Sequence, residues 1–271
     1  MSEAERIHGI HAVQALLERH PQRVLRLRVA SGREDARIAK LLALAAAAGR
    51  PVERVAAGQL GRHGREVHQG VVAEVQPQAP WSEEQLLAAL AAADRPLLLA
   101  LDGVQDPHNL GACLRTADAC GALAVIVPRD RAAQLNATVR KVAAGAAETT
   151  PVVAVTNLSR SLRLLKDAGL WVVGADGGAA QDADAADLTV PLVLVMGAEG
   201  TGLRQLTRQH CDLLVRLPQL GAVESLNVSV AAGMLLYEAV RQRRRAAVAG
   251  GAEPGPAPGA GRGRVRGAAS R

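Results

Sequence analysis

The chain has 271 residues, of which 49% are hydrophobic and 1% aromatic, and its formal net charge is +6. This length and composition suit one large globular domain or two modest ones with a core of Leu, Val and Ala. They exclude a disulfide-rich scaffold, because only three scattered cysteines are present, Cys113, Cys120 and Cys211. No apolar run approaches the roughly 18 residues of a membrane span, and residues 1–10 lack the apolar core of a signal peptide. We therefore expect a cytoplasmic protein that is not bound to a membrane.

Basic charge is concentrated at the two ends of the chain. Residues 1–76 have a net charge of +4 and residues 241–271 a net charge of +7, whereas residues 97–240 have a net charge of −3. This distribution suits a polyanionic partner such as RNA, although an ordinary solvated surface would give the same charges.

The first segment predicts a compact α/β domain over residues 1–76. "HAVQALLERH" and "REDARIAKLLALAAAAGR" have the apolar spacing of helices, and Gly49 and Pro51 end the second of them. "RVLRLRVA" alternates like a half-buried strand, and "PVERVA" and "HQGVVAEV" predict two more short strands. Residues 77–96 contain a short helix with Ser82 as its cap, bracketed by prolines, and we interpret them as an interdomain linker.

From residue 97 the pattern becomes a regular alternation of strands and helices. The strands are short continuous apolar runs, "LLLAL", "AVIVP", "VVAV", "WVVGA", "LVLVMG" and "LLVRLP". This pattern predicts a parallel sheet covered on both faces, over residues 97–245. Trp81, Trp171 and Tyr237 are interpreted as packing residues. Residues 246–271 are mostly Gly, Pro, Ala and Arg, and we expect a disordered basic tail.

Polar side chains stand just after three of these strands, where open α/β sheets bind their ligands. They are Asn109, Arg115, Glu199, Ser225 and Asn227. Each has an ordinary structural explanation when taken alone. Asn109 could cap its helix, Arg115 could pair with Asp118, Glu199 could lie in a surface turn, and Ser225 could cap the last helix. Their occurrence at one predicted sheet edge favours an active site.

The segments "NLGACLRTADACG", "VMGAEGTGL" and "LPQLGAVESLNVSVAAG" resemble the three motifs of the SpoU family of RNA 2′-O-ribose methyltransferases. "IHGIHAVQALLER" and "HQGVVAEV" resemble the substrate-binding domain of family members that modify 23S rRNA. By contrast, "GAEGTG" lacks the order of the GxGxxG dinucleotide fingerprint, which disfavours a nucleotide-binding oxidoreductase.

The resemblance implies an α/β fold with two parts. A small N-terminal L30e-like RNA-binding domain would precede a C-terminal α/β-knot domain with a mostly parallel sheet and a trefoil knot. S-adenosylmethionine (AdoMet) would be the methyl donor, bound near Gly197, Leu217 and Leu226, and no metal is expected. The catalytic set would be Asn109, Arg115, Glu199, Ser225 and Asn227, and the protein would form a homodimer with these groups near the subunit interface.

The implied activity is 2′-O-methylation of a guanosine ribose in 23S rRNA, in the peptidyl-transferase P loop. A tRNA or another rRNA site as the target is an alternative, and a non-catalytic RNA-binding or ribosome-assembly factor is a second one. Because a guanidinium stays protonated, we expect Arg115 to bind phosphate and stabilise negative charge on the ribose oxygen. Asn109 and Glu199 would orient Arg115 and the ribose.

The N-terminal domain, with His8, His11, His20, His63 and His68, is expected to bind the RNA. With so few aromatic residues, phosphate contacts and arginine planes should dominate that binding. RNA affinity should therefore fall steeply in a salt titration. Deleting residues 246–271 should weaken RNA binding and leave the fold intact.

Overall fold

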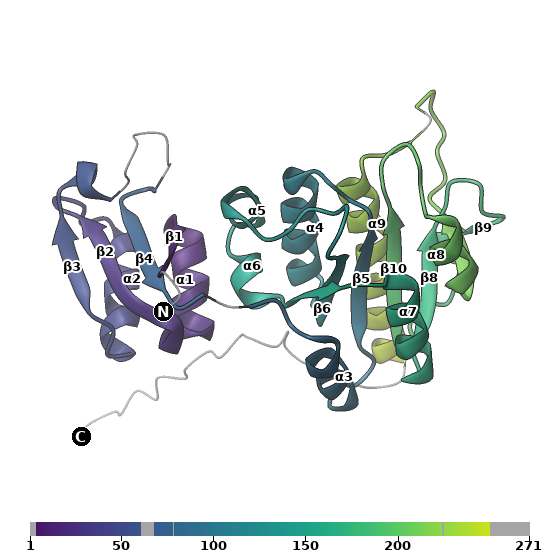
Figure 1. Ribbon diagram of the computed structural model, residues 1–271, viewed down its shortest axis with the longest axis horizontal. Helices are drawn as coiled ribbons and strands as arrows, with labels where there is room; N and C mark the ends of the chain where they lie inside the picture. Colours follow the sequence, from purple (N-terminus) through teal and green to yellow (C-terminus); the bar gives the residue numbers. More distant parts are fainter. Residues whose placement is uncertain (1–3, 61–67, 78, 224, 250–271) are drawn as a thin grey trace, which may run out of the picture.

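The computed structural model describes residues 4–60, 68–77, 79–223 and 225–249. Its strands form two sheets, one of four strands near the N-terminus and one of seven strands in the rest of the chain (Figure 1). Within the described ranges, no helix combines the length and apolar character needed to cross a membrane. The chain therefore has the α/β architecture, in two parts, that its sequence predicts.

The N-terminal part is a mixed sheet with both helices on one face. Its elements are β1 (Glu5–His8), α1 (Ile10–Arg19), β2 (Val24–Ala30), α2 (Ala36–Ala47), β3 (Val52–Val55) and β4 (Val71–Val75). The strand order is β1-β4-β2-β3, and only the β2–β3 pair is parallel. Leu16, Leu27 and Leu41 are fully buried between the helices and the sheet. The sequence did not predict β1, because only Ile7 of its four residues enters the core.

The other face of this sheet carries charges that neutralise one another. Arg26 pairs with Glu53 at 3.3 Å and with Glu74 at 2.9 Å, and Arg28 lies within 4 Å of the same two carboxylates. Much of the positive charge expected to bind RNA is therefore paired inside the domain. Among the described N-terminal residues, Arg19 and Arg37 are exposed and their side chains have no hydrogen bond or ion pair. His63 lies outside the described residues.

The second sheet is parallel throughout, in the order β7-β6-β5-β10-β8-β11-β9. Its strands are β5 (Leu97–Asp102), β6 (Ala124–Pro128), β7 (Val152–Val155), β8 (Trp171–Ala175), β9 (Gln181–Asp182), β10 (Leu192–Gly197) and β11 (Leu213–Arg216). The helices are α3 (Glu83–Ala91), α4 (Pro107–Ala119), α5 (Ala137–Ala143), α6 (Ala146–Thr149), α7 (Leu158–Asp167), α8 (Gln205–His210) and α9 (Val228–Ala249). The trefoil knot that the resemblance implies stays a prediction.

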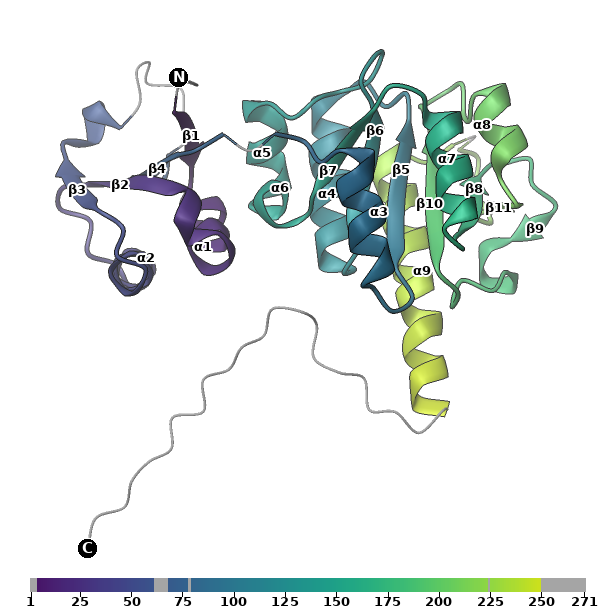
Figure 2. The same ribbon diagram turned by 60° about the horizontal axis from the view of Figure 1, so that its bottom comes forward.

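Successive residues of the central strands face two different cores. Leu97, Leu99 and Leu101 pack with helices α4, α5 and α9 on one face of the sheet, and Leu98 and Ala100 pack with α3 and α7 on the other. Figure 2 shows these helix layers on either side of the sheet. Burial on both faces explains why these strands are apolar at every position rather than at alternate positions.

The segment expected to link the domains packs into the second one. Ser82 accepts a hydrogen bond from the Gln85 backbone N–H, as its predicted role as a helix cap requires. Leu86 and Leu90 of the following helix α3 are buried in the core, and the backbone of Trp81 donates to Val152 at the edge of the sheet. Trp81 packs against this core, as expected.

Two aromatic residues expected in the core are exposed instead. Trp171 is 53% exposed at the start of β8, and Tyr237 is 65% exposed on α9. Helix α9 also continues to Ala249, into the segment predicted to be disordered. The remainder of that segment, residues 250–271, lies outside the described residues.

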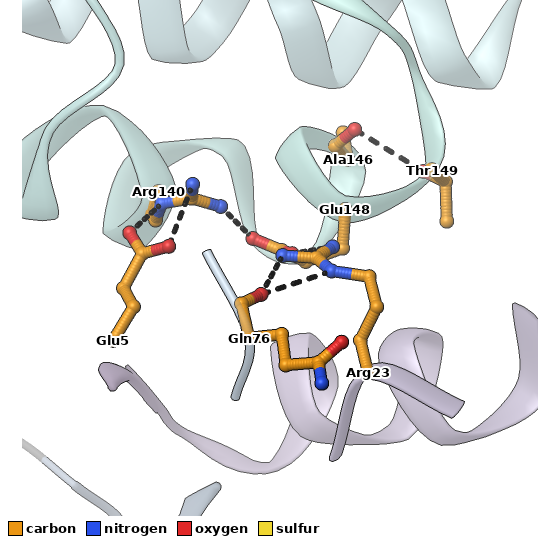
Figure 3. A network of polar contacts seen from close by, with 7 residues as sticks. All are labelled: Glu5, Arg23, Gln76, Arg140, Ala146, Glu148 and Thr149. Atoms are coloured by element: carbon orange, nitrogen blue, oxygen red, sulfur yellow. Dashed lines mark hydrogen bonds and ion pairs between the residues drawn. The ribbon is translucent and has the colours of Figure 1, made fainter. Parts of the chain in front are cut away.

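The two parts of the chain meet through a cluster of charged side chains that we call the docking cluster (Figure 3). Glu148 lies between two arginines. One carboxylate oxygen accepts from Arg23 Nη1 at 2.9 Å, and the other accepts from Arg140. Arg140 also pairs with Glu5 at 2.8 Å, and Arg23 also donates to the Gln76 carbonyl at 3.3 Å. The Glu148 side chain is only 1% exposed, so two cations compensate a carboxylate that has lost its water.

Gly145 allows the backbones of the two parts to approach closely beside this cluster. Its φ of +104° is strained for any other residue. A Cβ at this position would lie 3.2 Å from the His11 carbonyl oxygen and 3.2 Å from the Ala15 Cβ. The close backbone approach at Gly145 and the ion pairs of the docking cluster therefore both favour this placement of the N-terminal part against the second part.

The three cysteines are free, and burial makes two of them poor nucleophiles. Burial raises the pKa of Cys113 to about 12, and burial together with Asp212 raises the pKa of Cys211 to about 12. At pH 8 both thiols stay protonated in the folded protein, so a thiolate-selective reagent should modify them far more slowly than the denatured chain. Equal rates with and without denaturant would contradict this burial.

Candidate active site

Two of the three polar turns leave the sheet from neighbouring strands at the same edge. Strands β5 and β10 pair in parallel, with Asp102 opposite Gly197 at their carboxyl ends. Asn109 lies in the first turn of α4, which follows β5, and Glu199 lies in the loop that follows β10. Asn227 directly precedes α9, which packs against α4. This topology brings Asn109 together with Glu199 and Asn227, which lie 90 and 118 positions away from it in the sequence.

Asn109, Glu199 and Asn227 form one hydrogen-bonded group, which we call the three-loop cluster. Asn227 Nδ2 donates to Glu199 Oε1 at 2.6 Å and to Asn109 Oδ1 at 2.9 Å. Asn109 Nδ2 donates to the same Glu199 oxygen at 3.3 Å. The backbone N–H of Val228 also donates to this oxygen at 3.3 Å, so a single carboxylate oxygen joins all three loops.

The caps of helices α4 and α9 show that neither Asn109 nor Ser225 serves as a helix cap. Asp106, and not Asn109, caps α4, since its side chain accepts from the His108 N–H and Pro107 occupies the first helical position. Asn227, and not Ser225, caps α9, since its Oδ1 accepts from the Ser229 N–H at 2.9 Å. The side chain of Asn109 is therefore used for the three-loop cluster alone.

Arg115 stands apart from this cluster. It is exposed, and its side chain forms no hydrogen bond or ion pair with any residue that the structure describes. The expected alternative partner, Asp118, accepts instead from Thr149 Oγ1 at 2.5 Å and Thr150 Oγ1 at 3.1 Å. Arg115 lies six residues after Asn109, about 9 Å further along the helix axis. No hydrogen bond joins Arg115 to Asn109 or Glu199 within the described residues, so the expectation that these two residues orient Arg115 and the ribose stays a prediction.

The remaining predicted residues take no part in the hydrogen bonds of the cluster. Ser225 is exposed, and Leu217 and Leu226 are half-buried on the segment between β11 and α9. Gly197 ends β10, where a Cβ would overlap the carbonyl group of Gly202. Leu220, between the two half-buried leucines, is fully exposed. This edge of the sheet thus offers backbone groups and uncovered apolar surface next to the three-loop cluster.

One buried residue of this region was not singled out from the sequence. Asp102 ends β5, is almost fully buried and accepts a hydrogen bond from the Arg204 backbone N–H at 2.9 Å. Its position directly after an apolar strand was a signal that could have identified it. Among the described residues, no group of three or more His, Cys, Asp or Glu side chains is arranged to hold a metal ion.

This fold, with its three loops meeting at one sheet edge, defines a class of two-domain α/β proteins whose site lies at the carboxyl ends of parallel strands. Residues 96–237 match the SpoU rRNA Methylase family, and residues 6–81 match the RNA 2′-O ribose methyltransferase substrate-binding domain. The chain belongs to the SpoU rRNA Methylase family.

Relatives at high identity share nearly the whole chain. It is 57% identical over 245 residues to the 23S rRNA (guanosine-2′-O-)-methyltransferase RlmB of Pseudomonas putida, covering 90% of this chain and 99% of that one. It is 58% identical over 244 residues to RlmB of Pseudomonas aeruginosa, covering 90% and 98%. The SpoU methyltransferase AviRb from Streptomyces viridochromogenes, solved in complex with AdoMet, aligns with a TM-score of 0.73 and 26% identity, covering 90% of this chain and 92% of that one.

Proposed function

We propose that this chain transfers a methyl group from AdoMet to the 2′-oxygen of a guanosine ribose in 23S rRNA. The convergence of Asn109, Glu199 and Asn227 from three distant loops is the observation that supports this function most directly. The two Pseudomonas relatives, which align with this chain over nearly their whole length, carry names that specify this reaction. The P loop as the target rests on the resemblance of the N-terminal segment.

We propose a separate role for each of the two parts that contain the two sheets. Residues 1–76 would bind the rRNA, residues 77–96 would connect to the methyltransferase domain of residues 97–245, and residues 246–271 would form a basic tail. Arg19 and Arg37, exposed and free of ion pairs within the described chain, are the N-terminal cations best placed to contact phosphates. The protein would act in the cytoplasm, where its rRNA substrate is made.

The residues at the sheet edge fit an AdoMet molecule. Gly197 lets the backbone of Gly202 pack against the end of β10 and so shapes the loop there, and Leu217 and Leu226 offer half-buried apolar side chains for an adenine ring. When bound, AdoMet supplies a methyl group made electrophilic by its positively charged sulfur. Asn109, Glu199 and Asn227 would orient the ribose beside it, with Ser225 completing the pocket, because in-line transfer needs the oxygen aligned with the breaking C–S bond.

Arg115 would supply the positive charge that the reaction needs. A ribose hydroxyl is a poor nucleophile near neutral pH, so negative charge developing on its oxygen must be stabilised as the proton leaves. A guanidinium stays protonated and therefore serves as a phosphate ligand and oxyanion stabiliser rather than as a base. The exposed Arg115 side chain has this capacity, although no hydrogen bond joins it to the three-loop cluster of its own chain within the described residues.

A homodimer would resolve this separation. Val230, Met234 and Tyr237 are exposed apolar side chains spaced along one stripe of α9, the helix that packs beside α4. A second copy covering this stripe would lie beside α4, the helix that carries Arg115, and we propose that Arg115 of one chain then acts with the three-loop cluster of the other. Apolar surface of this kind on a solvent-facing helix is typical of a subunit interface.

Introducing a charge on this stripe should disrupt the dimer. Met234→Glu should convert a particle of twice the 28.1 kDa chain mass into a monomer, measured by light scattering, because a carboxylate would be buried at the interface. Leu206→Glu, at an exposed apolar residue of α8, should leave the dimer intact. A wild-type protein that is monomeric at micromolar concentration would contradict the proposed interface.

Methyl transfer itself is tested with labelled AdoMet and 23S rRNA transcribed without modifications. We expect label in 2′-O-methylguanosine at a single position in the P loop. Label recovered only from tRNA would favour the alternative substrate. A folded protein that binds rRNA and transfers no label to any RNA would favour the non-catalytic alternative.

A further inference from the structure

Asp102 is a buried carboxylate that the mechanism above does not use. It ends β5 in the middle of the sheet, with Gly197 opposite it on β10, and its side chain is 0% exposed. A carboxylate without access to water is costly unless hydrogen bonds and a cation compensate it. The partners of Asp102 therefore indicate what it contributes to the fold.

Among the described residues, the hydrogen-bond and ion-pair partners of Asp102 all belong to Arg204. Asp102 Oδ2 accepts from the Arg204 backbone N–H at 2.9 Å, and Oδ1 lies 3.5 Å from Arg204 Nε. Oδ1 makes no hydrogen bond with a described residue, so its compensation comes from the charge of this guanidinium. Arg204 lies directly over Gly103, where a Cβ would be 3.0 Å from Nη2.

Arg204 ends the segment of residues 197–204, which we call the glycine loop. The loop folds back on itself, because Ala198 and Gly202 exchange two backbone hydrogen bonds of 3.2 and 2.9 Å. Gly200 and Gly202 have positive φ angles of 79° and 66°. Glu199, at the tip of this turn, is the residue that joins the three-loop cluster. The loop is thus fixed at two points, by Glu199 at its tip and by Asp102 at its exit.

We propose that Asp102 is a positioning residue for AdoMet binding, acting through Arg204 to hold the glycine loop in its binding conformation. This inference rests on the proposed function, since Gly197, the first residue of the loop, is assigned to AdoMet there. Arg204 contributes to this role through two different groups. The backbone N–H of Arg204 fixes the path of the loop, and its guanidinium compensates the buried charge.

The test measures AdoMet affinity by calorimetry on the full-length protein, with affinity for a 23S rRNA fragment as a second measurement. Asp102→Ala should weaken AdoMet binding by about 10-fold or more, because a buried N–H loses a charged acceptor, and leave RNA affinity unchanged. Arg204→Ala keeps the backbone N–H and should have a smaller effect. Asp102→Asn should have a larger effect than Arg204→Ala, since the new amide group would face Arg204 Nε.

The double variant Asp102→Asn/Arg204→Ala provides a rescue, because it removes the donor that would face the new amide. It should bind AdoMet more tightly than Asp102→Asn alone. Asp212→Ala is the matched control. Asp212 accepts from the Val172 backbone N–H at 2.9 Å and pairs with Lys166 at 2.6 Å, so it makes the same kinds of contact away from the site.

Wild-type AdoMet affinity in the folded Asp102 variants would overturn this proposal. So would equal losses of AdoMet affinity, RNA affinity and melting temperature in the Asp102 variants and the Asp212 control. If Asp102→Ala does not fold, the ranking of Asp102→Asn, Arg204→Ala and the double variant decides the question. Failure of the wild-type protein to bind AdoMet would instead overturn the proposed function.

Discussion

Replacing Arg115 with Ala should lower the turnover number for methyl transfer by about 10²–10³-fold, the usual cost of removing one group that stabilises a developing oxyanion. AdoMet affinity and melting temperature should stay near their wild-type values, because the Arg115 side chain is exposed and forms no hydrogen bond or ion pair with a described residue. Arg115→Lys should also be strongly impaired, since an ammonium cannot reproduce the planar, two-pronged contact of a guanidinium with phosphate.

The matched control for this prediction is Arg160→Ala. Arg160 is an exposed arginine on α7, on the opposite face of the sheet, and its side chain has no ion pair within the described chain. Its loss should leave turnover unchanged. Arg115→Ala protein with near-normal turnover would show that the guanidinium takes no part in the reaction.

Replacing Glu148 with Ala should release the N-terminal domain from the methyltransferase domain. The substitution leaves Arg23 and Arg140 facing each other without the carboxylate that separates them (Figure 3). Breaking a buried ion pair by removing one partner costs about 3–5 kcal/mol, because it leaves the other charge buried without compensation. Small-angle scattering should show a larger radius of gyration, and limited proteolysis should cut faster between the domains.

Two comparison variants sharpen this second prediction. Glu148→Gln keeps the shape of the side chain and should be intermediate, because it still accepts one hydrogen bond from an arginine. Glu18→Ala removes an exposed carboxylate that pairs with Lys40 inside the N-terminal domain, and it should leave the scattering unchanged. Unchanged scattering and proteolysis in Glu148→Ala would show that the docking cluster does not hold the domains together.

The sheet of the second domain follows directly from local sequence. "LLLAL" and "LVLVM" are apolar at every position because both faces are covered, and this pattern distinguishes a parallel sheet from a half-exposed one. The pairing of Arg23 with Glu148 could not be predicted, since the two residues are 125 positions apart and each occurs in a segment with an ordinary local pattern. Tyr237 was expected in the core because helical spacing identifies an apolar stripe without showing which surface covers it.

The residues of the candidate site could be predicted from the sequence, but their contacts could not. Asn109, Glu199 and Asn227 each follow a strand that ends at the same edge, so their convergence could be expected from a parallel sheet. The cap of α4 could also have been assigned, because Pro107 favours the first helical position and so places the cap at Asp106. The distance between Arg115 and Asn109 along α4 could have been expected from their six-residue spacing. The pairing of Asp118 with Thr149 and Thr150 could not, because those residues lie more than 30 positions away in the sequence.

A crystal structure of the protein with S-adenosylhomocysteine tests the central claim most directly. The account predicts this product bound at the carboxyl edge of β10, against Gly197, Leu217 and Leu226, with its sulfur directed toward the three-loop cluster. The same product bound at another part of the molecule, with the three loops empty and Asn109, Glu199 and Asn227 unaffected, would contradict it.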